Sequence, residues 1–262
     1  MTNAIILAAG LGSRLSPLTD DKPKSLVKFG EMSLLERMIK MFHKHGIKDI
    51  SIITGYKKEK IDFSEITYFE NKNYENNSTL ESLFSGEEKI LDSTIITYSD
   101  IIFEEKILEE LLNSKNNISV VVDKNWKEYW RLRIDETIDE ATETAIFNNK
   151  KMITSIGMKN SNANGHFIGL MKLEKEGSKK FKELYQEIKK QSTAKNNDLN
   201  KNLPFEKLRI VDLLQGLIER NYTINSILIK NGWLEFDTMN DYELYSNMLA
   251  QNTLHKLMEL NY

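Results

Sequence analysis

Residues 4–9 (AIILAA) form an unbroken apolar run that Gly10 closes and a polar, basic loop follows. Six apolar residues without polar alternation are typical of a strand that is buried on both faces. Such a strand belongs in a sheet that carries helices on both sides, so this run favours an α/β fold.

The next elements continue this pattern. Ser33 followed by Glu36 is a capping box, and the apolar residues behind it recur at helical spacing until Gly46 ends the helix. Residues 49–56 (DISIITGY) predict a second strand. The order strand, loop, helix, strand favours a Rossmann-like doubly wound sheet, in which ligands bind at the carboxyl ends of the strands.

The rest of the chain predicts two kinds of structure. Up to residue 124 strands and helices alternate: strands at 66–70, 94–103 and 118–124, and helices at about 79–91 and from about 105. Short, partly alternating segments without a helix between them follow, at 131–137, 143–149, 152–158 and 166–173, as expected of a small β-rich insertion. Helices are expected at 175–191, at 210–220 and from 240, a polar loop at 192–204, and strands at 223–230 and 233–237. We therefore expect one domain, 1–262, with a mixed sheet.

Composition excludes several classes of function. The chain has no cysteine, which rules out disulfides, thiolate catalysis and cysteine-bound metal. A net charge of −3 gives no basic face for nucleic acid, and no stretch approaches the about 20 apolar residues of a membrane span. His43 and His45 are two residues apart and are interpreted as solvated helix-end residues rather than metal ligands. A cytoplasmic protein is expected.

The loop at residues 8–27 concentrates glycine, proline and basic side chains. Gly10 and Gly12 allow the backbone to approach an anion closely, and Arg14 and Lys24 supply positive charge. The loop is not a GxGxxG fingerprint, because Leu15 stands where the third glycine would, and no GK[ST] follows. From composition alone, a phosphate cradle and an ordinary strand-to-helix connection remain equally open.

The stretch IILAAGLGSRLSPLTDDKPKSL resembles the signature GxGxRxxPxTxxxPKxL of the nucleotidyltransferases that make nucleoside-diphosphate sugars and CDP-alcohols. It matches at eight positions: Gly10, Gly12, Arg14, Pro17, Thr19, Pro23, Lys24 and Leu26. The resemblance implies that Arg14 grips a triphosphate and that Lys24 reaches the α-phosphate and the phosphate of an acceptor. It also implies that the backbone lines the base and phosphates at Leu7, Ala8, Ala9, Gly10 and Gly12.

Two aspartates are candidates for Mg²⁺, which prefers carboxylate and phosphate oxygens. Asp100 follows the apolar run TIITYS, and Asp237 lies in WLEFDT; the resemblance matches both to the metal aspartates of the family. For either residue alone a structural role is an alternative, such as a helix cap at Asp237 and Thr238. Glu235 shares a strand face with Asp237 and is a weaker candidate.

Residues 71–83 (NKNYENNSTLESL) resemble the corresponding segment of the choline-phosphate and phosphonate cytidylyltransferase branch. Asn side chains can pair with both the carbonyl and the amine of cytosine, so Asn76, Asn77 and Ser82 are candidates for base or ribose contacts. An asparagine-rich turn that caps the next helix is the alternative. The chain has no proline between Pro23 and Pro204. It therefore lacks the Glu-Lys-Pro element that sugar-1-phosphate nucleotidyltransferases usually carry.

The acceptor is expected to bind within residues 124–262, and residues 1–123 to bind the nucleotide. An aromatic and basic cluster at 125–133 (NWKEYWRLR) lies where this family builds its acceptor pocket, although it could equally pack the insertion. Arginines beside the aromatics suit an acceptor with a carboxylate, such as phosphoglutamine, or a phosphonate. The candidate residues are Trp126, Trp130, Arg131, Arg133, His166 and Asp212.

The resemblance thus implies a Mg²⁺-dependent cytidylyltransferase. It would join CTP to phosphoglutamine, phosphocholine or an aminoalkylphosphonate, release pyrophosphate and serve cell-surface or capsule modification. The alternatives are a sugar-1-phosphate nucleotidyltransferase that uses UTP, dTTP or GTP, and a catalytically silent nucleotide-sensing module. The chain is expected to act as a monomer or homodimer.

Overall fold

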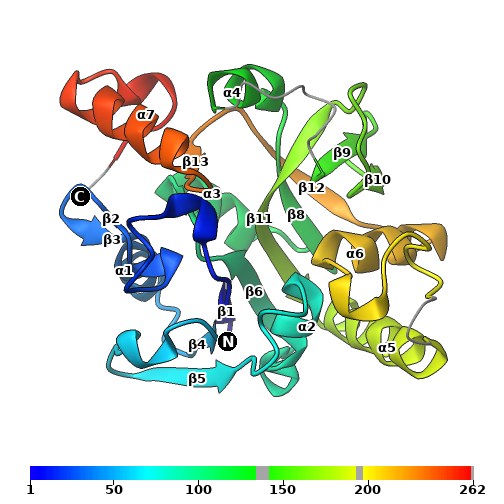
Figure 1. Cartoon of the computed structure of the whole chain (residues 1–262). Coiled ribbons are helices and arrows are strands. Elements are labelled where there is room, and N and C mark those ends of the chain that lie inside the picture. The colour runs from blue at the N-terminus through cyan, green and yellow to red at the C-terminus, as the bar shows by residue number, and fades with distance from the viewer. Residues whose placement is uncertain (134–141, 193–196, 261–262) are drawn as a thin grey trace.

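The computed structural model describes residues 1–133, 142–192 and 197–260, which include a nine-stranded mixed sheet (Figure 1). Strand β1 is central and pairs in parallel with β4 and β6, whereas β11 runs antiparallel to β6, β8 and β9. The strands are β1 (Asn3–Ala8), β4 (Ile50–Thr54), β5 (Ile66–Glu70), β6 (Ser93–Tyr98), β8 (Ile118–Asp123), β9 (Thr144–Phe147), β10 (Ile153–Ile156), β11 (Gly165–Glu174) and β12 (Asn225–Ile229). The expected mixed α/β fold is confirmed.

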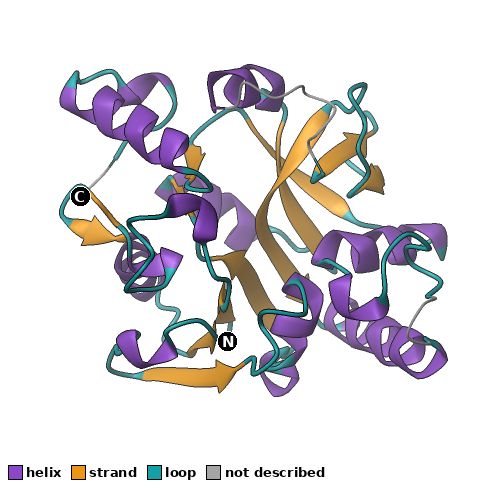
Figure 2. Cartoon of the chain, viewed as in Figure 1, coloured by secondary structure: helices purple, strands orange, loops and turns teal. Residues whose placement is uncertain are grey.

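Helices cover both faces of this sheet, as Figure 2 shows. Ala4 and Ile6 of β1 belong to one apolar cluster, with residues of α1, α3 and α7, whereas Ile5 and Leu7 join α2, α5 and α6 in a second. The helices are α1 (Leu34–Lys44), α2 (Thr79–Phe84), α3 (Glu105–Asn113), α4 (Trp126–Arg133), α5 (Glu176–Gln191), α6 (Ile210–Glu219) and α7 (Met239–Ala250). This two-sided burial explains why residues 4–9 carry no polar alternation. Within the described ranges, no helix has both the length and the apolar character needed to cross a membrane.

The single strand expected at 94–103 is wrong, because the chain turns at Ser99 and Asp100. Strand β6 ends at Tyr98, and β7 (Ile101–Phe103) leaves the large sheet to pair antiparallel with β13 (Trp233–Glu235). A second small pair joins β2 (Lys28–Phe29) to β3 (Met32–Ser33). The turn after β6 therefore lies where the main sheet meets the β7–β13 pair.

Two further expectations need correction. The strand expected at 131–137 is wrong for its first three residues, which form the last turn of α4, while 134–137 lie outside the described residues. Trp126, Tyr129 and Arg133 are buried at helical spacing, so one face of this segment packs as a helix. The helix expected at 79–91 ends at Phe84 and is followed by a 3₁₀ turn at Glu87–Lys89.

Strand β11 contains an irregularity that only glycine accommodates. Its pairing with β8 shifts register between Phe167 and Met171, and Gly169 lies there with φ 82°. A Cβ atom at this position would lie 2.4 Å from Cδ2 of Tyr98. The register shift thus brings β11 directly against the aromatic ring at the end of β6.

We expect Gly169→Ala to lower the free energy of unfolding by roughly 2–3 kcal/mol, because it adds both backbone strain and a clash. Urea denaturation measures the loss. Gly10→Ala is the control, since a Cβ there would meet nothing within 4 Å, and it should shift the urea midpoint far less. Equal shifts in the two variants would contradict this account of β11.

Candidate active site

A cavity of about 520 Å³ opens at the carboxyl ends of β1 and β6, where doubly wound sheets bind ligands. One end, which we call the loop end, is lined by the glycine-rich segment after β1 and the segment before α2. The other, the aromatic end, is lined by Tyr98, Trp130, Arg133, Glu143 and His166. A charged centre made of Lys24, Asp100 and Asp237 also lines the cavity.

The glycine-rich loop is folded around Gly12. This residue has φ 64°, and its carbonyl accepts hydrogen bonds from the Leu15 amide and the Thr19 hydroxyl, both at 2.9 Å. A Cβ at Gly12 would lie 2.8 Å from Cβ of Lys24. The glycine therefore lets the two halves of the signature pack against each other, which presents Lys24 to the cavity.

Lys24 bridges the two predicted metal aspartates. Its ammonium donates hydrogen bonds to Oδ2 of Asp100 at 2.7 Å and to Oδ1 of Asp237 at 2.9 Å. Arg14 pairs with Oδ2 of Asp237 at 2.6 Å, although 69% of its side chain is exposed. Signature cations and predicted metal ligands thus form one compact ionic group.

The surroundings favour the charged forms of this group. Burial lowers the pKa of Lys24, but Asp100 and Asp237 more than offset it, so its pKa is raised above the ordinary value. Burial raises the pKa of Asp237, but Lys24 and then Arg14 reverse the effect, and its pKa is lowered. At neutral pH both groups are ionised.

The β7–β13 pair explains why Asp100 and Asp237 meet. Asp100 ends the turn that leads into β7, Asp237 follows β13 by two residues, and the Phe236 amide donates to the Asp100 carbonyl at 2.9 Å. Backbone pairing thus holds together two carboxylates that are far apart in sequence. One carboxylate atom, Asp100 Oδ1, is buried without a hydrogen-bond partner in the described structure.

The loop end contains most of the residues predicted to contact the nucleotide. Asn76 lies outside the lining; it is exposed and donates to the Asn73 side chain at 3.2 Å. Those that line the cavity are Leu7, Ala8, Ala9, Gly10, Gly12, Asn77 and Ser82.

Sequence reasoning missed Asn71, which organises this end. Its buried amide nitrogen donates to Asn77 Oδ1 at 2.7 Å and to Ser82 Oγ at 2.8 Å, and its oxygen accepts from Asn77 Nδ2 at 2.9 Å. Its place directly after the strand at 66–70 was the available signal. Asn71 fixes the orientation of both lining side chains.

The aromatic end contains three of the predicted acceptor residues: Trp130, Arg133 and His166. Trp126 lies outside the lining; it is buried and packs its ring 5.9 Å from that of His166 and 6.4 Å from that of Trp130. Arg131 is exposed and also lies outside the lining. Of the aromatic and basic cluster at 125–133, Trp130 and Arg133 thus line the cavity, whereas Trp126 packs behind them.

Arg133 is committed to carboxylates of the chain itself. Its guanidinium donates to both carboxylate oxygens of Asp241, at 2.9 and 3.1 Å, and to Glu235 Oε2 at 2.5 Å. This network ties α4 to β13 and α7. An arginine that holds two internal carboxylates does not offer a free charge to a carboxylate ligand, which weakens the reason for expecting such a ligand.

Asp212 is likewise used inside the protein. It lies at the start of α6, where its carboxylate accepts from the Arg209 backbone amide at 2.7 Å and pairs with the Arg209 guanidinium at 3.1 Å. It lies outside the cavity lining. The contacts of Asp212 are therefore those of a residue that caps the start of a helix.

Glu143 is a lining residue that sequence reasoning missed. Its Oε1 accepts from the Tyr98 hydroxyl at 3.3 Å, and burial raises the pKa of its carboxyl to about 8, with Arg209 opposing the shift. Burial, aided by Arg133, lowers the pKa of His166 to about 3. Near pH 7 the histidine is therefore neutral and the carboxyl is largely protonated.

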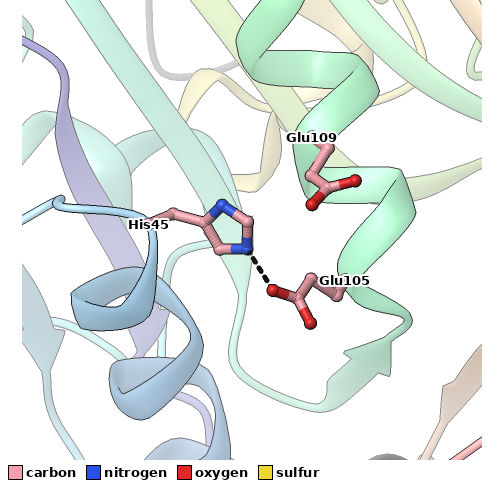
Figure 3. A group of neighbouring side chains, drawn as sticks. All are labelled: His45, Glu105 and Glu109. Atoms are coloured by element: carbon pink, nitrogen blue, oxygen red, sulfur yellow. Dashed lines mark hydrogen bonds and ion pairs between the residues drawn. The ribbon is translucent and has the colours of Figure 1, made fainter.

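Figure 3 shows a separate group, His45, Glu105 and Glu109, whose ligand atoms lie within 4.8 Å of one another. His45 ends α1 and bonds to Glu105 Oε1 at 2.9 Å, while Lys44 pairs with Glu105 Oε2 at 2.6 Å. His43 is exposed. These contacts join α1 to α3 and already provide Glu105 with a cation.

Comparison with known proteins gives cytidylyltransferases for phosphoglutamine and choline phosphate, and also enzymes named for sugar phosphates, such as a glucose-1-phosphate cytidylyltransferase. The chain is 29% identical over 259 residues to the CTP:phosphoglutamine cytidylyltransferase of Campylobacter jejuni, covering 92% of this chain and 98% of the relative. It is 36% identical over 115 residues to the choline-phosphate cytidylyltransferase of Streptococcus pneumoniae, covering 42% of this chain and half of the relative. The solved structure of CTP:phosphocholine cytidylyltransferase from Streptococcus pneumoniae superposes with a TM-score of 0.76 at 21% identity, covering 95% of this chain and 99% of that one.

The family assignment rests on a longer match than the signature loop. Residues 4–155, more than half of the chain, match the family model of the MobA-like NTP transferase domain. The match spans β1, the glycine-rich loop and Asp100, and extends to β10. The chain is therefore a nucleotidyltransferase and belongs to the family of MobA-like NTP transferase domains.

Proposed function

We propose that this nucleotidyltransferase transfers CMP from CTP to a small phosphorylated acceptor and releases pyrophosphate. The observation that carries the proposal is the charged centre, where Lys24 lies within 3 Å of Asp100 and Asp237 and all three line the same cavity as the glycine-rich loop and the aromatic residues. The relative from Campylobacter jejuni, which the match covers over 98% of its length, is named for CTP and phosphoglutamine. This supports cytosine as the base.

The charged centre also fits a Mg²⁺ ion. Asp100 and Asp237 offer carboxylate oxygens, one of which, Asp100 Oδ1, is buried without a partner among the described residues, and the phosphates of a nucleotide would provide further oxygens. We propose that these two aspartates hold the ion. When bound, Mg²⁺ would neutralise phosphate charge near the α-phosphorus.

The side chains of the centre can do the remaining work by alignment and charge. An acceptor phosphate oxygen is an anion near neutral pH, so its attack on the α-phosphorus needs no general base. Arg14, which is largely exposed, can turn toward the triphosphate, and Lys24 can stabilise charge on the α-phosphate. Asn77 and Ser82, held by Asn71, would contact the base or ribose.

We further propose that residues 1–123 bind the nucleotide and residues 124–262 bind the acceptor within one domain. The candidate acceptors are phosphoglutamine, phosphocholine and an aminoalkylphosphonate, and the product would serve cell-surface or capsule modification from the cytoplasm. Since Trp130 and His166 line the aromatic end, they are the proposed acceptor contacts, together with Arg133, whose guanidinium lies 5.8 Å from the centre of the Trp130 ring.

Pyrophosphate release from CTP, UTP, dTTP, GTP and ATP, each with Mg²⁺ and the three acceptors, tests the base assignment. We expect kcat/KM for CTP to exceed that for UTP at least about tenfold, because a site that hydrogen-bonds one base leaves buried groups unpaired with another. Preference for UTP, dTTP or GTP would support a sugar-1-phosphate substrate instead. CTP binding by calorimetry without pyrophosphate release would support the silent module.

Lys24→Ala should lower kcat about 100-fold or more, because it removes a donor aimed at developing charge. Circular dichroism should show that the variant stays folded. Lys22→Ala is the control, since Lys22 is half-buried outside the cavity lining and pairs only weakly, at 3.8 Å, with Asp21. Equal rates for wild type and Lys24→Ala would remove Lys24 from the mechanism.

Burial of Glu143 predicts a pH dependence of stability. Its folded pKa of about 8 lies above the unfolded value of 4.5, so between these values the folded state binds more protons. The stability contributed by the buried protonated carboxyl is thus present below pH 4.5 and is lost as pH rises toward 8. Glu143→Gln removes this titration while keeping the shape of the side chain.

We therefore expect Glu143→Gln to gain stability over wild type as pH rises from 5 to 8.5, by about 1 kcal/mol or more. The free energy of unfolding in urea, measured for both proteins at several pH values, checks this. His166 titrates in both proteins, so its opposite effect at acid pH cancels in the difference. A difference that does not change with pH would contradict the buried, protonated state of Glu143.

A further inference from the structure

Three polar atoms at the aromatic end have no hydrogen-bond partner in the described structure. They are Trp130 Nε1, Glu143 Oε2 and His166 Nδ1, each shielded from solvent in a residue that lines the cavity. The residues come from α4, from the segment before β9 and from β11, so three separate elements each bring an unpaired atom to this end of the cavity. Unpaired buried polar atoms are unfavourable, and their gathering at a cavity indicates that something else completes them.

The neighbouring charges of the chain are already used. Arg133 is held by Asp241 and Glu235, and the Arg209 guanidinium is held by Asp212 and by the carbonyls of Thr142 and Gly157. Tyr98 donates to the other oxygen of Glu143. Among the described residues none completes Trp130 and Glu143, so we take a bound ligand as the source of their partners.

Both unpaired groups are hydrogen-bond donors. The indole N–H of Trp130 can only donate, and the protonated carboxyl of Glu143, whose Oε1 already accepts from Tyr98, carries its proton on Oε2. Each group therefore needs an oxygen acceptor. A quaternary or a primary ammonium offers none, whereas an amide carbonyl or a carboxylate offers acceptor oxygens to both.

We propose that Trp130, Glu143 and His166 form a head-group subsite that selects acceptors bearing a carbonyl or carboxylate oxygen. This deepens the proposed function and rests on it. Trp130 and Glu143 donate to the oxygen atoms of that group, and the neutral ring of His166, 5.5 Å from the Trp130 ring, fills the third position.

The subsite lies where an acceptor phosphate could reach the charged centre. Tyr98, which contacts Glu143, precedes Asp100 by two residues, and Glu235, which contacts Arg133, precedes Asp237 by two. The head group would thus be held between the same two chain segments that carry the aspartates. The same two chain segments would therefore both select the head group and place the acceptor phosphate near the charged centre.

Steady-state kinetics with four acceptors tests the subsite: phosphocholine, 2-aminoethylphosphonate, O-phosphoserine and phosphoglutamine, with pyrophosphate release as the signal. We expect kcat/KM for phosphoglutamine or O-phosphoserine to exceed that for phosphocholine at least about tenfold. Trp130→Phe and Glu143→Met should raise KM for that acceptor about tenfold and leave KM for CTP unchanged. Glu143→Gln, which retains a hydrogen-bond donor, should restore much of the affinity that Glu143→Met loses.

The control is Glu128→Gln, an exposed position on the same helix as Trp130, which should leave every constant unchanged. Phosphocholine as the best acceptor, or an unchanged acceptor KM in both Trp130→Phe and Glu143→Met, would overturn the subsite while leaving the nucleotidyl transfer standing. Calorimetric binding of the acceptors to the protein without nucleotide gives the same comparison independently. If the acceptors bind with the expected order but CTP gives no pyrophosphate, the cytidylyl assignment fails and the subsite holds.

Discussion

The ammonium of Lys24 between Asp100 and Asp237 is the contact on which the rest of the site depends. Two carboxylates held this close repel each other unless a cation lies between them, and here the cation comes from the same loop that is expected to bind phosphate. The centre is therefore formed before any substrate arrives. A pre-organised group of this kind does not have to reorganise during reaction, which is the main way in which enzymes stabilise developing charge.

Backbone geometry makes that contact possible in two places. Gly12 lets the loop fold onto Lys24, because any side chain there would clash with Lys24 Cβ. The β7–β13 pair then brings Asp237 beside Asp100, with the Phe236 amide bonded to the Asp100 carbonyl. The absence of a side chain at Gly12 and the backbone pairing of β7 with β13 do not depend on charge. Together they fix the positions of the three charged groups, Lys24, Asp100 and Asp237.

The sequence predicted what depends on local pattern. The buried run at residues 4–9, the capped helix after Ser33 and the two-sided sheet follow from periodicity, and the signature loop identified Arg14 and Lys24. It failed where tertiary contacts decide. The departure of β7 from the sheet depends on a partner more than 100 residues away, and α4 was taken in part for a strand because its buried face becomes visible only with its neighbours in place. Asn71 and Glu143 lacked a motif, since their importance comes from which polar atoms they meet.

The aromatic end shows why composition is a poor guide to ligand charge. Arginines beside tryptophans in the sequence suggest a pocket for a carboxylate, but Arg133 is saturated by Asp241 and Glu235, and burial keeps Glu143 largely protonated. Charges that neutralise one another inside the wall contribute rigidity to the pocket rather than attraction for an ion. What such a wall leaves for a ligand is hydrogen-bonding geometry: a donor on Trp130 and a donor on the protonated carboxyl of Glu143. Discrimination among acceptors of similar size should therefore follow the pattern of their donors and acceptors more closely than their net charge.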